Sequence, residues 1–128
     1  MQKIFLSIGA ATAAIAVMLG AFGAHALKEK FSPDQLQVFE TGVRYQFYHA
    51  FALIIVGLMA ERFNSSLLNY SGWLFLTGII FFSGSLYLLS AKNLLGIESW
   101  KFLGPVTPLG GLCFIIAWAL MLISVLKK

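Results

Sequence analysis

Charged residues are scarce in this 128-residue chain. Asp, Glu, Lys and Arg make up 11% of it, whereas hydrophobic residues make up 59%. Soluble domains are typically about 25% charged and about 45–50% apolar, so this composition excludes an ordinary soluble domain. The nine basic residues are scattered along the chain, and the net charge of +4 forms no basic patch of the kind that binds nucleic acid. We therefore expect no nucleic-acid partner, and we expect anionic lipid headgroups as the counter-charge.

Cysteine and recognisable catalytic motifs are also lacking. The single cysteine, Cys113, lies in an apolar run and by itself forms neither an intrachain disulfide nor a thiolate metal site. The sequence has no phosphate-binding loop, hydrolase serine elbow, zinc-protease motif or glycine-rich dinucleotide fingerprint. These absences favour a non-enzymatic protein, and we expect no catalytic residue, no bound metal and no cofactor.

What the chain has in abundance is long apolar runs. They have roughly the 20-residue length that crosses a bilayer, and they cover about residues 4–24, 43–60, 68–90 and 106–126. The sequence therefore predicts one all-α domain over residues 1–128, a bundle of four transmembrane helices. Acidic residues are missing from the middle of every run, which argues against a proton-coupled exporter that relies on a buried acid.

The first apolar run has features of a secretory signal peptide as well as of a membrane span. Lys3 precedes it, and Ala24-His25-Ala26 has the small-residue pattern of a cleavage site. The run is longer than the core of about 7–15 residues that a signal peptide has, so we expect an uncleaved helix. Its many Gly and Ala residues are typical of surfaces on which membrane helices pack closely.

Four spans place both termini on one side of the membrane, and basic residues then bear on the orientation. Four basic residues lie on the terminal side (Lys3, Arg62, Lys127 and Lys128), and five lie on the opposite side (Lys28, Lys30, Arg44, Lys92 and Lys101). Because the two counts are nearly equal, the positive-inside rule does not determine the orientation of the protein in the membrane. Lys3 and the free amine lean toward cytoplasmic termini in the cell membrane.

Residues 33–42, between the first two runs, predict a short amphipathic helix that lies at the membrane interface. Ser32 and Gln35 have the spacing of a capping box, and Pro33 suits the first helical position. We expect this helix to bend near Gly42 into the second span.

The side of the membrane opposite the termini collects most of the side chains with chemical potential. On one helix, Tyr45 with His49 and Arg44 with Tyr48 are pairs separated by four residues. An ionisable group inside a membrane is costly unless it is paired, so His49 is where the search for function starts. The candidate functional face comprises His25, Glu40, Arg44, Tyr45, Tyr48, His49 and Thr107.

The two histidines allow two interpretations. If the first two spans are neighbours, His25 and His49 could meet and bind haem or a metal, or relay a proton. In the interpretation that we favour, each neutral imidazole is hydrogen-bonded to a tyrosine hydroxyl or a backbone carbonyl and holds helices together. A zinc site needs about four ligands, which two histidines and a distant Cys113 do not supply.

Three blocks of the sequence resemble a known family. They are residues 20–27 (GAFGAHAL), 39–50 (FETGVRYQFYHA) and 104–111 (GPVTPLGG), in matching order and spacing. The chain is similar, over essentially its whole length, to the small bacterial membrane family catalogued as domain of unknown function 423, related to eukaryotic transmembrane protein 256. The resemblance implies a multi-pass plasma-membrane protein of four helices whose first span stays attached. It implies no reaction and no catalytic residue.

We therefore expect a non-enzymatic membrane component that contributes to membrane integrity or acts as an accessory subunit. The face around Arg44 would contact anionic lipid headgroups, a membrane-protein partner or a second copy of the chain. The alternative, from a different class, is a small cofactor-binding or transport protein that uses the histidine pair at one membrane face.

Overall fold

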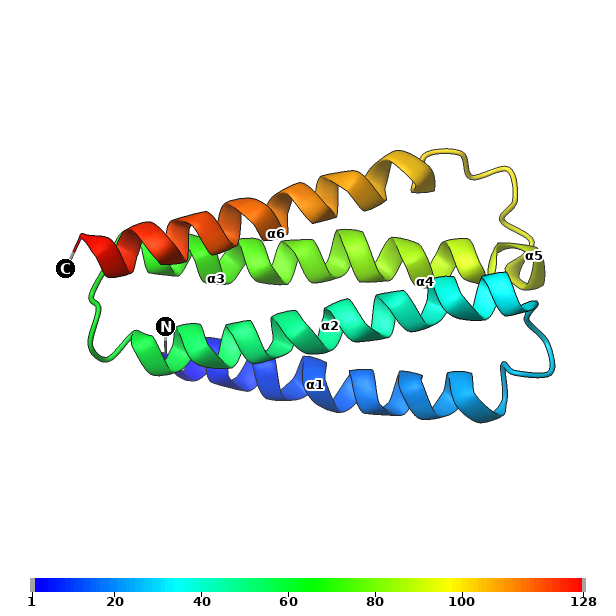
Figure 1. Ribbon diagram of the computed structural model, residues 1–128, viewed down its shortest axis with the longest axis horizontal. Coiled ribbons are helices and arrows are strands. Elements are labelled where there is room, and N and C mark those ends of the chain that lie inside the picture. The colour runs from blue at the N-terminus through cyan, green and yellow to red at the C-terminus, as the bar shows by residue number, and fades with distance from the viewer. Residues whose placement is uncertain (1, 128) are drawn as a thin grey trace.

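The computed structural model describes residues 2–127, which are helical along most of their length (Figure 1). No strand occurs within these residues, which confirms the all-α class. In chain order the elements are α1 (Gln2–His25), α2 (Pro33–Met59), α3 (Ser66–Gly78), the π-helix η1 (Ile79–Ser83), α4 (Gly84–Ser90), α5 (Lys92–Leu95) and α6 (Leu103–Leu126). Met1 and Lys128, which belong to the predicted domain and to the orientation argument, lie outside the described residues.

Three helical rods are long and apolar enough to cross a membrane. They are α1, the rod Ser66–Ser90 that α3, η1 and α4 form together, and α6. These rods coincide with the first, third and fourth predicted spans. The second predicted span lies in α2, a helix of 27 residues whose N-terminal half is polar. Of the four predicted spans, three are therefore found as candidate spans by length and composition.

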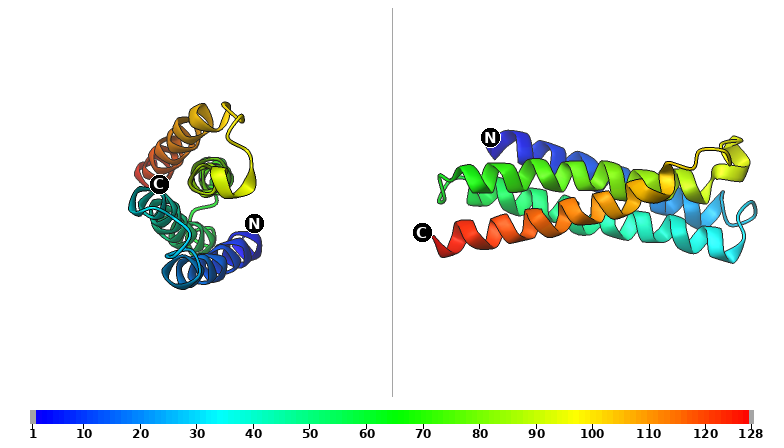
Figure 2. Two further views of the ribbon diagram at one scale, coloured as in Figure 1. Left: turned by 90° about the vertical axis from the view of Figure 1, so that its right-hand side faces the viewer. Right: turned by 90° about the horizontal axis from the view of Figure 1, so that it is seen from above.

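The rods run alternately in opposite directions, so that the N- and C-terminal ends lie at the same end of the molecule (Figure 1). α1 packs along α2, and α6 packs along the Ser66–Ser90 rod. α2 also contacts that rod, while α1 and α6 lie on opposite sides of the molecule (Figures 1 and 2). We call the end that holds the α1–α2 loop and α5 the loop-side rim, and the other end the terminal rim.

Small residues explain why α1 lies so close to α2. A Cβ atom at Gly9 would lie 2.9 Å from the carbonyl oxygen of Ala50, and one at Gly23 would lie 2.8 Å from the ring of Phe39. The small residues of the first run thus form a packing surface, as membrane helices often require. The same two contacts fix the register, with Gly23 level with Phe39 near the loop-side rim and Gly9 level with Ala50.

The helix predicted for residues 33–42 does not form as a separate element. The predicted capping box is present, since the Ser32 amide donates to Gln35 Oε1 at 2.8 Å and the Gln35 amide donates to Ser32 Oγ at 3.2 Å. From this start α2 continues without a break through Gly42, where we expected a bend. Gly42 lies against the ring of Tyr87, and its carbonyl accepts a hydrogen bond of 2.7 Å from Ser83. Packing against the Ser66–Ser90 rod therefore keeps the helix continuous.

The Ser66–Ser90 rod changes its winding at η1, where the backbone is π-helical. Such segments occur mostly as short bulges inside α-helices. α6 crosses the rod at this point, and a Cβ atom at Gly110 would collide with the backbone nitrogen of Phe82. Glycine in α6 thus permits direct backbone contact with η1. α6 begins at Leu103, slightly before the predicted residue 106, and contains Pro108 in its interior.

The apolar core divides into two clusters. The larger one joins all four rods, with Phe5, Leu53, Phe75 and Phe114 among its buried members. The smaller one lies between α1 and α2 and their loop, and includes Ala16, Leu27, Phe31, Phe39 and Val43. The interval between the clusters on α2 carries Gln46 and His49, both buried.

Candidate functional site: a lateral groove between α2 and α6

The predicted functional face does not form one cluster. His25 ends α1 and is exposed, as are Glu40 and Arg44 on the outer side of α2. Tyr45, Tyr48 and His49 lie deeper along α2, and Thr107 lies on α6. The structure therefore divides the candidate residues into a rim group, a group inside the bundle and an isolated threonine.

Arg44 lies below the loop-side rim and points back toward it. It is five residues beyond Phe39, which at 1.5 Å per residue places its backbone about 8 Å below the level of Phe39 and Gly23. Its Nη2 donates a hydrogen bond of 3.2 Å to the hydroxyl of Thr41, one turn nearer the rim. The side chain of Arg44 therefore directs its charge along the helix toward the loop-side rim.

His49 is buried within the bundle, with 5% of its surface exposed. Its Nδ1 lies 2.7 Å from the carbonyl oxygen of Tyr45. A carbonyl only accepts, so Nδ1 carries the proton, and Nε2 accepts a hydrogen bond of 3.2 Å from the indole nitrogen of Trp118. Both ring nitrogens are thus occupied, and the neutral imidazole joins α2 to α6.

The histidine pair that we considered from the sequence is not formed. His49 lies ten residues beyond Phe39 along α2, whereas His25 lies two residues beyond Gly23 in the opposite direction. Because Gly23 is level with Phe39, their helix positions differ by about 18 Å along the bundle. α1 and α2 are neighbours, as predicted. However, they pack in an antiparallel register that places His25 and His49 at different levels along the bundle. The alternative function based on this pair therefore has no structural basis.

A groove opens beside His49 on the side of the bundle. It has a volume of about 480 Å³ and lies between α2 and α6, with η1 contributing one residue. Its lining residues are Tyr45, Tyr48, His49, Phe82, Gly111, Phe114, Ile115 and Trp118. Aromatic rings and one imidazole make up most of this surface, so the groove is an apolar site with few polar atoms.

Ring stacking shapes the wall of the groove. The His49 ring lies 3.5 Å from the ring of Phe114 between centroids, with 5° between their planes. The Tyr45 ring is inclined by 20° to His49 and by 25° to Phe114. Trp118 crosses the end of this stack at 60° to His49. Three side chains from two helices therefore present nearly parallel rings.

Sequence reasoning missed the α6 and η1 half of the groove. Phe82, Phe114 and Trp118 lie in apolar runs and look like ordinary lipid-facing or core residues. The one available signal was Gly110-Gly111, which permits a close backbone approach of α6 to its neighbour. Thr107, predicted as part of the functional face, instead pairs with the hydroxyl of Ser85 at 2.5 Å and joins α6 to α4.

A second feature that sequence reasoning missed is a buried amide. Gln46 is 4% exposed. Its Nε2 donates to the carbonyl oxygen of Thr12 at 2.8 Å, and its Oε1 accepts from the Tyr87 hydroxyl at 2.5 Å. One side chain thus joins α1, α2 and α4, and its amide nitrogen and oxygen each have a partner inside the bundle.

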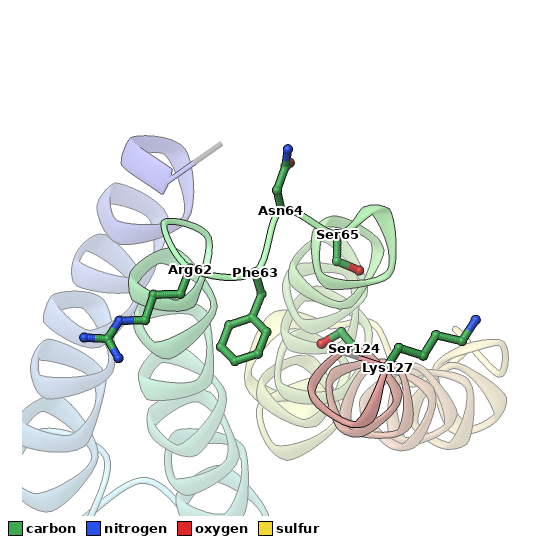
Figure 3. A pocket seen from close by; sticks show the side chains of 6 residues that line it. All are labelled: Arg62, Phe63, Asn64, Ser65, Ser124 and Lys127. Carbon is green, nitrogen blue, oxygen red and sulfur yellow. The ribbon is translucent and has the colours of Figure 1, made fainter.

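A smaller cavity of about 300 Å³ lies at the terminal rim, lined by Arg62, Phe63, Asn64, Ser65, Ser124 and Lys127. The side chains of Arg62 and Lys127 extend to opposite sides, away from each other (Figure 3). Ser124 donates to the carbonyl oxygen of Met121 at 2.7 Å within its own helix. These polar groups do not converge on a common point, so the cavity is not an assembled anion site.

The described residues contain no group of three or more His, Cys, Asp or Glu side chains placed to hold a metal ion. Apolar rods, a polar rim and a lateral aromatic groove together define the class of a small all-helical membrane protein.

Comparison with known proteins places the chain within this class. A family described as "Protein of unknown function (DUF423)" matches residues 19–111. The chain is 43% identical over 127 residues to UPF0382 membrane protein YwdK of Bacillus subtilis, with 98% of each chain covered. It is 45% identical over 126 residues to UPF0382 membrane protein SAB0533 of Staphylococcus aureus, again with 98% of each chain covered. The chain belongs to the DUF423 family, as its three blocks predicted. No solved structure matches it.

Proposed function

We propose that this protein is a four-span, non-enzymatic component of the cell membrane whose loop-side rim binds anionic lipid headgroups through Arg44. The fourth span in this proposal is α2. Its 27 residues extend about 40 Å, which exceeds the hydrocarbon thickness of about 30 Å. α2 also packs between candidate spans along its length, which supports a crossing parallel to theirs.

The single observation that carries the lipid-binding proposal is the setting of Arg44. Its exposed side chain leaves α2 below the rim and bends up to the hydroxyl of Thr41. A guanidinium has five donors in a planar fork, and Thr41 occupies only part of this capacity. A phosphate at the membrane surface is a ligand for the remaining donors, because guanidinium and phosphate pair in a bidentate geometry.

Other basic side chains support the same surface. The exposed residues of the loop-side rim include Lys28, Lys30, Lys92 and Lys101, and each basic residue near an anionic surface contributes about 1 kcal/mol of attraction. Of the two non-enzymatic roles expected from the sequence, membrane integrity is the one that lipid binding supports. We place the termini in the cytoplasm in this proposal, because Lys3 is a basic residue at that end of the bundle.

The test is the affinity for phosphatidylglycerol of the protein in nanodiscs of neutral lipid, measured by native mass spectrometry. Arg44→Ala should weaken binding about fivefold, because one basic residue is removed from the surface. Arg44→Lys keeps the charge but loses the planar fork, so its affinity should lie between that of the unaltered protein and that of Arg44→Ala. Lys127→Ala is the control for non-specific charge, because Lys127 is exposed at the opposite, terminal rim. An equal loss in Lys127→Ala, or no loss in Arg44→Ala, would contradict a site at Arg44.

A further inference from the structure

Two hydroxyl groups beside the groove have no hydrogen-bond partner among residues 2–127. They belong to Tyr45 and Tyr48, which are 38% and 53% exposed. These residues lie six and nine positions beyond Phe39, so their backbones are about 9 and 14 Å below its level. This step rests on the proposed function: if α2 is the fourth span, hydrocarbon surrounds the bundle at that depth, where an unpaired hydroxyl is costly. Two residues that line the groove therefore carry hydroxyl groups without a hydrogen-bond partner among residues 2–127.

The other polar atoms of the groove are already engaged. The carbonyl of Tyr45 and the indole of Trp118 use both nitrogens of His49. A ligand thus meets two phenol hydroxyls, each able to donate or to accept, and no charged side chain among the lining residues. This chemistry selects a neutral molecule with hydrogen-bonding groups, and carbonyl oxygens on the ligand would engage both phenols as donors.

The shape of the wall selects a flat molecule. The groove is lined by the partly exposed rings of Tyr45, Tyr48 and Trp118, whereas His49 and Phe114 are buried and stack on each other. Aromatic groups prefer offset-stacked or edge-on contact with other rings, so exposed rings of this kind favour a planar ligand. A flexible acyl chain gains only area from such a wall. The volume of about 480 Å³ falls in the range of about 300–1,000 Å³ that is typical of small-molecule sites.

From these observations we infer that the groove between α2 and α6 binds a flat, lipid-soluble ring with carbonyl acceptors, of the quinone class. The ring lies against the exposed aromatic rings that line the groove, and its carbonyl oxygens accept hydrogen bonds from Tyr45 and Tyr48. The apolar tail leaves through the lateral opening into the lipid. This binding site is independent of Arg44 and of the proposed headgroup contact.

Trp118 lies in the groove and serves as a built-in reporter. In a Trp73→Phe, Trp100→Phe background it is the remaining tryptophan of the sequence. A benzoquinone with a ten-carbon tail, added to this protein in phosphatidylcholine nanodiscs, should quench its fluorescence saturably. Tyr45→Phe and Tyr48→Phe each remove one donor and little else, and each should weaken binding about fivefold.

Gly111 offers a second variant that fills the groove. A Cβ atom there would lie 3.8 Å from the ring of Phe82, an ordinary contact. Gly111→Leu should therefore fold and abolish saturable quenching, because its side chain occupies the ligand volume. Gly84→Leu is the matched control, since a Cβ atom at Gly84 has no neighbour within 4 Å and this residue does not line the groove.

Three results would overturn the inference. Quenching that rises linearly in all variants would show partition of the quinone into the bilayer alone. Native mass spectra that show phospholipid adducts lost in Gly111→Leu, without a quinone adduct in the parent, would assign the groove to an acyl chain. A dimer that Gly111→Leu dissociates would assign it to a second copy of the chain.

Discussion

Gln46 shows how one polar residue organises three helices. Its amide contacts Thr12 of α1 and Tyr87 of α4, and all the buried side-chain nitrogen and oxygen atoms of residues 2–127 have a partner. In hydrocarbon an unsatisfied amide costs roughly several kcal/mol. A helix register that gives the Gln46 amide its partners is therefore strongly preferred over a register in which it has none. Gln46 thus helps to set the register of the bundle.

Replacing this amide tests its contribution. Gln46→Leu should lower the free energy of unfolding in detergent by about 1 kcal/mol, because hydrogen bonds between membrane helices are worth about 0.6–2 kcal/mol. Tyr87→Phe should have a similar effect. The double variant should be less destabilised than the sum of the two, since the partner hydroxyl is no longer left unpaired. Strict additivity would contradict a direct bond between them.

His49 could be predicted as a functionally interesting residue with a backbone carbonyl as one possible partner, but its second partner could not be predicted. The local sequence places the Tyr45 carbonyl one turn away, where the histidine finds it. The other partner, Trp118, is 69 residues further along the chain. The hydrogen bond to Nε2 exists only because α6 packs beside α2. The same packing allows His49 to hold these two helices together.

At the scale of the elements, η1 and α6 meet at Gly110, where no side chain separates the two backbones. The backbone of Phe82 in η1 occupies the place where a side chain at Gly110 would lie. Phe82 also lines the groove, so this contact determines how far apart the walls are. The π-helix and the glycine act together, because each changes the position of the Phe82 backbone relative to α6.

Gly110→Ala should therefore destabilise the protein by about 1–3 kcal/mol, the usual cost of forcing an extra methyl group into a packed interior. Gly84→Ala is the comparison, because space is open there and alanine stabilises a helix interior by about 0.5–1 kcal/mol relative to glycine. Thermal unfolding in one detergent measures both. Equal melting temperatures for the two variants would show that α6 does not depend on this contact.

At the scale of the whole molecule, the four rods predict a topology. If α2 crosses the membrane, the α1–α2 loop and the turn after α2 lie on opposite sides. In a Cys113→Ser background, Lys30→Cys and Asn64→Cys should react with a membrane-impermeant maleimide from opposite faces of the membrane. Right-side-out and inverted vesicles provide the comparison. Labelling of both from the same face would contradict the fourth span.

The orientation follows from the same experiment. With cytoplasmic termini, Asn64→Cys lies on the cytoplasmic side and should be labelled in inverted vesicles. Lys30→Cys should then be labelled in right-side-out vesicles. The reverse pattern would keep four spans and overturn the orientation that we propose.

The amino-acid sequence by itself determined the features that depend on local composition. It predicted the all-α class, the positions of the candidate spans, the capping box at Ser32 and Gln35, and the family. These succeed because hydropathy and helix capping act over one or a few turns, and lipid requires backbone groups to be satisfied within each helix.

Only the tertiary structure decided which faces meet. The continuity of α2 through Gly42, the separation of His25 from His49, and the groove formed with Phe114 and Trp118 all depend on residues distant in the chain. Side chains that lie in apolar runs have no periodicity that identifies their neighbour, because every face of such a helix is apolar. Close glycine contacts and buried hydrogen bonds select one packing among many, and that selection creates the groove.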